Sequence, residues 1–82
     1  MAGTINAVVA AWRLGNFASG GSLMTDGDNL WSYALQIGET AGTDYKIAFD
    51  IYPRSMTTAK HINMARAVAD EVLRFDESID RV

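Results

Sequence analysis

The fold is decided by residues 45–73, which read YKIAFDIYPRSMTTAKHINMARAVADEVL. The first part alternates with the period of a strand: one side takes Tyr45, Ile47, Phe49 and Ile51, and the other takes Lys46, Ala48, Asp50 and Tyr52. Pro53 ends the strand because it has no amide to donate to a neighbour. Ser55 is a suitable cap, and from Met56 apolar residues recur at helical spacing. The stretch therefore predicts a strand over 45–52 and a long helix from Met56 to about Phe75.

The residues before this stretch predict one short helix and two further strands. Thr4 can cap a helix over 5–14, and Gly15 suits its termination in the left-handed conformation. A loop is expected over 17–22, followed by a short extended segment over 23–25. Asp26-Gly27 is a strong signal for a tight hairpin turn. Residues 29–37 then alternate as a strand, and 38–44 form a second turn before the strand at 45–52.

These elements predict an α+β fold with the order α-β-β-β-α. Three strands form an antiparallel meander, and the long carboxy-terminal helix covers its apolar face. The apolar side of the strand over 29–37 takes Trp31, Tyr33, Leu35 and Ile37, and that of the strand over 45–52 takes Tyr45, Ile47, Phe49 and Ile51. The whole chain, 1–82, is expected to be one domain with frayed ends at 1–4 and 76–82. The length allows no second domain.

Composition excludes several classes of function. The 82 residues carry a net charge of −3 and no cysteine, so thiolate metal sites and a cysteine nucleophile are excluded, and a general nucleic-acid coat is disfavoured. The single histidine, His61, has no second metal ligand at helical spacing. We therefore expect no metal, no cofactor and no enzyme activity. The longest apolar run, 7–12, is too short for a membrane span, which favours an intracellular protein that starts at its natural methionine.

The most unusual cluster of polar residues surrounds the start of the predicted long helix. A helix start carries unpaired amides and a partial positive charge, so it favours an anion, either a phosphate or a carboxylate of a partner. The alternative is structural: the hydroxyls cap the helix, and the histidine is partly buried and bonded to a strand or loop. The candidate binding residues are Tyr52, Arg54, Ser55, Thr57, Thr58, Lys60 and His61.

Two further groups of side chains have competing interpretations. Tyr33, Tyr45 and Phe49 could stack nucleic-acid bases, but a place in the core under the long helix is favoured. Trp12 and Tyr52 are left as possible surface residues. Acidic residues collect at the two predicted turns, where they could face a basic partner or could simply suit the turns: Asp26, Asp28, Glu39 and Asp44.

Two short motifs carry a resemblance. Residues 26–33, DGDNLWSY, and 55–61, SMTTAKH, occur in this order, and the chain resembles a group of small phage and plasmid proteins of unknown function over residues 15–66. The sequence departs from that pattern where Pro53-Arg54 separates Tyr52 from Ser55. The resemblance implies a compact αβ domain in a mobile genetic element and the cytoplasm of a bacterial host. It implies no catalytic residue.

Three functions compete at this stage. The first is a phage protein that inhibits a host defence complex by covering its surface, as anti-CRISPR proteins do. The second is a nucleic-acid accessory protein with Arg54, Lys60 and Arg66 on phosphates, which the net charge of −3 disfavours. The third is a structural module that self-associates, for example as a homodimer. We expect the first, with no membrane as a partner.

Overall fold

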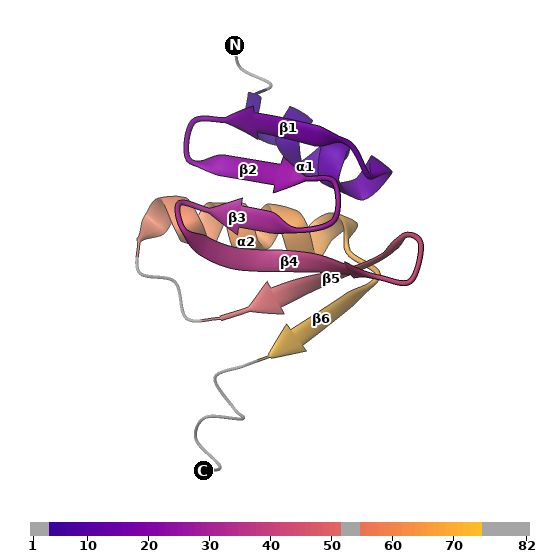
Figure 1. The fold of residues 1–82 in the computed structure, drawn as a ribbon. Helices are drawn as coiled ribbons and strands as arrows, with labels where there is room; N and C mark the ends of the chain where they lie inside the picture. Colours follow the sequence, from indigo (N-terminus) through magenta and orange to yellow (C-terminus); the bar gives the residue numbers. More distant parts are fainter. Residues whose placement is uncertain (1–3, 52–54, 75–82) are drawn as a thin grey trace.

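The computed structural model describes residues 4–51 and 55–74, which form two helices and one six-stranded sheet (Figure 1). The helices are α1 (Thr4–Leu14) and α2 (Met56–Val68). The strands are β1 (Phe17–Gly20), β2 (Leu23–Asp26), β3 (Leu30–Ser32), β4 (Leu35–Ala41), β5 (Tyr45–Asp50) and β6 (Glu71–Arg74). They lie side by side in chain order, antiparallel from β1 to β5 and parallel between β5 and β6. The α+β class is confirmed, but the three-stranded meander and the single long helix are wrong.

Helix α1 ends as the sequence predicts. Gly15 has φ of 82°, and its amide donates to the carbonyl of Trp12 at 3.1 Å. The amide of Asn16 donates to the carbonyl of Ala11 at 2.8 Å. This pair of bonds is the Schellman arrangement, which satisfies carbonyls at a helix end and requires a left-handed residue.

Helix α2 begins as predicted and ends early. The Ser55 hydroxyl accepts from the amide of Thr58 at 3.1 Å, so Ser55 is the N-cap. The helix stops after Val68, although the apolar stripe continues to Leu73. Asp70 holds the chain at this point: its carboxylate accepts from the amide of Lys46 at 2.8 Å, and its own amide donates to the Lys46 carbonyl at 2.8 Å.

Residues 71–74 form a strand because they pair with the free edge of β5. The connection from β5 through α2 to β6 is a crossover between parallel strands, and it brings Val72 beside Ala48. A helix that continued to residue 74 would place Asp70 one turn from Arg66 and one turn from Arg74. Asp70 pairs instead with Arg13 of α1, and Arg74 pairs with Asp50 of β5, both at 3.3 Å.

The predicted strand over 29–37 is two strands joined by a tight turn. Tyr33 has φ of 58°, a left-handed conformation that is rare outside glycine, and its amide donates to the Ser22 carbonyl at 2.6 Å. The segment 17–22, expected to be a loop, supplies β1 at the edge of the sheet. The second predicted turn begins at 38, whereas β4 continues to Ala41.

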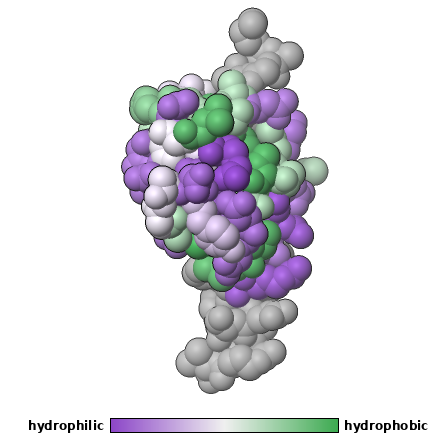
Figure 2. All heavy atoms as spheres, turned by 90° about the vertical axis from the view of Figure 1, so that its right-hand side faces the viewer, coloured by the Kyte–Doolittle hydropathy of each residue, from purple (hydrophilic) through white to green (hydrophobic). Residues whose placement is uncertain are grey.

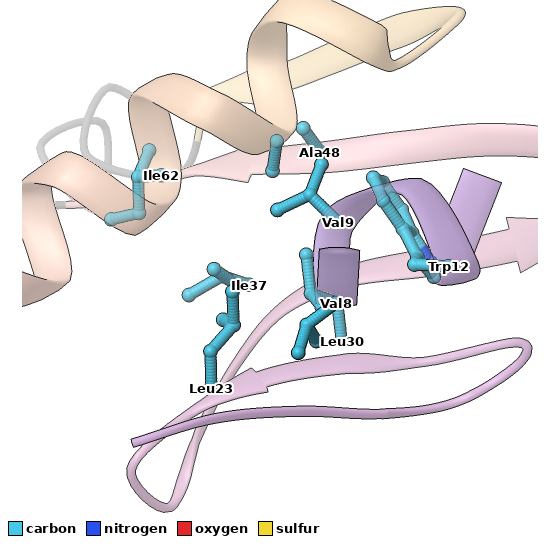
Figure 3. Close-up of a cluster of buried hydrophobic side chains, with 9 residues drawn as sticks. Val8, Val9, Trp12, Leu23, Leu30, Ile37, Ala48 and Ile62 are labelled. Atoms are coloured by element: carbon cyan, nitrogen blue, oxygen red, sulfur yellow. The ribbon is translucent and has the colours of Figure 1, made fainter. Parts of the chain in front are cut away.

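Both helices cover the same face of the sheet. In β5 this face is opposite to the one predicted, whereas Ile37, which was expected on the apolar side of its strand, is buried in the core. Figure 1 shows α1 and α2 behind the strands, with nothing described in front of them. The covered face and the helices bury a single cluster (Figure 3), which consists of Val8, Val9, Trp12, Leu23, Leu30, Ile37, Ala48, Ile62 and Ala65. In β5 it is therefore Lys46 and Ala48 that point toward the helices, while Tyr45, Ile47 and Phe49 point away.

Trp12 explains why this face is the covered one. Its side chain is fully buried and lies over Gly38, where a Cβ atom would come within 2.7 Å of Trp12 Cζ2. Gly38 pairs with Leu30 on one side and with Ala48 on the other, and the small size of Gly38 and Ala48 leaves room for the indole. A shift of register between Leu30 and Trp31 allows both Ile37 and Gly38 to be buried.

Within residues 4–51 and 55–74, neither helix is long and apolar enough to cross a membrane.

Candidate functional site

The uncovered face of the sheet is the first candidate. We call it the open face and define it by the residues that alternate with the buried ones: Phe17, Met24, Asp26, Trp31, Gln36, Glu39, Tyr45, Ile47, Phe49, Glu71 and Leu73. Met24, for example, lies between Leu23 and Thr25, both of which are fully buried on the helix side. Met24 pairs with Trp31 across the strands, so apolar side chains adjoin one another on this face.

Large apolar side chains on the open face are exposed to solvent. Phe17 is 68% exposed, Tyr45 44% and Met24 42%. Trp31, Phe49 and Leu73 are half-buried, and Ile47 is buried between its neighbours on the face. The expectation that Tyr45 and Phe49 lie in the core under a helix is wrong, as is the expectation for Tyr33, which is 62% exposed at its turn. Trp12, left as a possible surface residue, is instead fully buried.

The charges of the open face are all acidic among the described residues. Asp26, Glu39 and Glu71 lie on it, and Glu39 and Glu71 flank Ile47 across the strands. The Tyr45 hydroxyl donates to Glu71 Oε1 at 2.9 Å, and this hydrogen bond raises the pKa of Tyr45 above 10.0. The face thus combines aromatic rings with fixed negative charge.

The second candidate is a hydrogen-bonded network at the start of α2. The Ser32 hydroxyl lies 2.8 Å from Nδ1 of His61 and 3.2 Å from the Thr58 hydroxyl, and the Ser55 hydroxyl lies 3.2 Å from that of Thr58. Ser32, Thr58 and His61 are buried. An open hollow of about 530 Å³ adjoins the network, lined by Ser32, Tyr33, Ala34, Leu35, Ser55 and Thr58.

The network contains a serine and a histidine within hydrogen-bond distance of each other, which are two of the three groups of a nucleophilic triad. Nε2 of His61 is buried and has no hydrogen-bond partner among the described residues, so no third group orients the ring. Ser32 itself is fully buried. The network joins β3 to α2, which is the structural role that the sequence left open for the histidine.

The structure brings some of the sequence-predicted site residues together and separates others. Ser55, Thr58 and His61 belong to the network, while Thr57 and Lys60 are exposed on α2. Tyr52 and Arg54 lie outside the described residues. Sequence reasoning missed Ser32. The available signal was that a buried histidine needs a hydrogen-bond partner, but the sequence does not indicate which hydroxyl lies near it.

Because His61 is buried in this network, we expect the protein to become less stable as the pH decreases. Burial, together with the charge of Lys60, holds the pKa of His61 below 6.5, so the folded state keeps the ring neutral while the unfolded chain protonates. We expect the free energy of unfolding to fall as the pH drops below 6.5, by up to about 1.4 kcal/mol per pH unit, and to level off below the pKa of the folded state. Urea denaturation followed by circular dichroism, between about pH 7.5 and pH 4.5, measures this.

The matched control is His61→Gln, which should show a flat profile over the same range. Asp26 does not interfere, because amides of Asn29 and Asp28 donate to its carboxylate and hold its pKa below 3.8. An equal slope in His61→Gln and in the parent protein would show that another group causes the effect.

The acidic turns lie at one end of the sheet, opposite to the network. The turn after β2 carries Asp26 and Asp28, and the turn after β4 carries Asp44. This end of the sheet faces the viewer in Figure 2, where hydrophilic residues gather at the centre. The Asp26 carboxylate caps its own turn at 2.8 and 2.9 Å, as the local interpretation predicts. Across the described residues, no group of three or more histidine, cysteine or acidic side chains could hold a metal ion.

Comparisons with models of protein families, with curated proteins and with solved structures find no match to this chain.

Proposed function

We propose that this chain is a small binding protein without catalytic activity, which acts by covering the surface of a partner protein with its open face. The observation that carries the proposal is the exposure of Phe17, Met24 and Tyr45 on a sheet face that no described element covers. Large apolar side chains that gather on one exposed face, as Met24 does beside Trp31, favour a surface that binds a partner. Aromatic residues and methionine are also enriched at the centres of protein interfaces.

The proposed setting is a bacterial host cell in which a phage-encoded protein of this kind blocks a host defence complex. The resemblance of the DGDNLWSY and SMTTAKH motifs to small phage and plasmid proteins supports this setting. The sequence alone favours a docking surface at the start of the last helix. The exposed apolar side chains favour the open face instead, and the mode of action, which is to cover the partner's surface, stays the same.

The experiment compares two double variants, each of which replaces two exposed apolar side chains. Phe17→Ser with Met24→Ser changes the open face, while Leu14→Ser with Met56→Ser changes residues that are 74% and 89% exposed on the helices. Tagged full-length protein is used to capture partners from nuclease-treated bacterial lysate, and the affinity for the captured partner is then measured with purified components. The open-face variant should bind at least about tenfold more weakly, since one buried anchor contributes about 1.4 kcal/mol or more.

The helix variant should bind as the parent does, and both should keep the circular dichroism spectrum of the parent. Unchanged binding of the open-face variant, or an equal loss in both variants, would contradict the proposal. If partners are captured from untreated lysate but not from nuclease-treated lysate, the result would favour a nucleic-acid accessory protein.

A further inference from the structure

We propose that the open face binds a basic protein segment whose arginine side chains stack on its aromatic rings and pair with its carboxylates. This inference rests on the proposed function and specifies the partner's chemistry. It is carried by the distribution of charge over the two faces of the sheet together with the exposed rings.

The positive charges of the described residues are all placed away from the open face. Arg13 and Arg74 form ion pairs with Asp70 and Asp50. The Lys46 ammonium points to the helix side and is enclosed there. Lys60 and Arg66 are exposed on α2, which packs against the other face. The carboxylates of the open face therefore have no cation beside them among residues 4–51 and 55–74.

On the open face a carboxylate and an aromatic ring lie close enough for one guanidinium group to contact the two together. Glu39 and Glu71 lie on the strands either side of β5, which places their backbones about 10 Å apart. Glu71 is held by the Tyr45 hydroxyl at 2.9 Å, and Tyr45 is 44% exposed. Arginine is the cation that suits such a site, because its planar group binds carboxylates through two parallel hydrogen bonds and stacks on aromatic rings.

The same charges disfavour the two other partners that an aromatic sheet face can take. A single strand of nucleic acid needs cations for its phosphates, and here it would meet carboxylates. A second copy of this chain in a symmetric dimer would place an acidic face against an identical acidic face, which opposes association.

The test is a titration of isotopically labelled full-length protein with an oligo-arginine peptide, followed by amide NMR shifts. Oligo-lysine and oligo-glutamate peptides of equal length are the comparison ligands. We expect oligo-arginine to shift the amides of Trp31, Ile47 and Glu71, to bind more tightly than oligo-lysine and to weaken with added salt; oligo-glutamate should cause no shift. Shifts confined to the turns after β2 and β4, or none with oligo-arginine, would overturn the proposal.

Two double variants with the same change of net charge sharpen the test. Glu39→Gln with Glu71→Gln should raise the Kd for oligo-arginine at least about fivefold, whereas Asp28→Asn with Asp44→Asn, placed at the turns, should change it less than about twofold. Equal effects of the two pairs would show attraction by net charge alone and would overturn the proposal. If binding of the captured partner depends on Phe17 and Met24 but not on Glu39 and Glu71, the open face is the docking surface, and the proposal of a basic partner is wrong.

Discussion

Trp12→Ala is expected to lower the free energy of unfolding by about 3–5 kcal/mol, the usual effect of removing a buried tryptophan. The indole is fully buried against Gly38, and its Nε1 donates to the carbonyl of Asp28 at 2.9 Å. The total stability of a chain of this length is about 4–12 kcal/mol, so much of it would be lost. Urea denaturation followed by far-ultraviolet circular dichroism measures the change.

The matched control is Trp31→Ala on the open face. Trp31 is half-buried and packs beside Met24 on the surface of the sheet, so its loss should cost only about 1–2 kcal/mol. Equal costs at the two tryptophans would contradict the assignment of the faces, because the chain would then have a covered face on each side.

A double-mutant cycle links the effect to the contact itself. Gly38→Ala should destabilise the protein by about 1–3 kcal/mol through overpacking, since its Cβ would lie 2.7 Å from Trp12 Cζ2. In a Trp12→Phe background the smaller ring vacates that space, and the cost of Gly38→Ala should shrink. An unchanged cost would place the strain elsewhere.

Local chemistry made the ends of several elements predictable. Gly15 ends α1, Ser55 caps α2, and Asp26-Gly27 makes the turn between β2 and β3, because each depends on residues within one turn of chain. The strand predicted over 45–52 is present as β5, which ends at Asp50, so its alternation also identified it. These features do not require any knowledge of what packs against them.

The covered face could not be predicted from alternation because both faces of the sheet carry apolar residues. In β5 the more apolar side, with Tyr45, Ile47 and Phe49, is the one left open, while Lys46 is enclosed. The choice depends on the fit of Trp12 over Gly38, a contact between residues that are far apart in the sequence. The helical pattern continued through residues 71–74, where pairing with β5 outweighed local propensity.

The candidate sites depend on the same long-range choices. Ser55, Thr58 and His61 lie within one segment and could be grouped from the sequence, but Ser32 joins them only through the packing of α2 on the sheet. The open face could not be recognised at all until the covered face was known. A sequence pattern identifies a strand with two sides, and tertiary packing decides which side a partner can reach.

Lys46 is the second position at which a large loss of stability is expected. It is 1% exposed, and its Nζ donates to the carbonyl of Gly27 at 3.0 Å and to the Thr40 hydroxyl at 2.6 Å. The same ammonium lies 5.7 Å from the centre of the Trp12 ring, so its stem and its charge both support the covered face. Burial lowers the pKa of Lys46 below 10.5, which reflects the cost of enclosing the charge.

Lys46→Ala should lower the free energy of unfolding by about 2–4 kcal/mol, because it leaves a cavity beside Trp12 and removes the donor to Gly27. Lys46→Met retains the length of the stem and should cost about half as much, which separates packing from hydrogen bonding. Lys60→Ala, on the exposed side of α2, should change stability by less than about 0.5 kcal/mol. If Lys46→Ala cost no more than Lys60→Ala, the ammonium would not be enclosed in solution, and the division of the sheet into a covered face and an open face would fail with it.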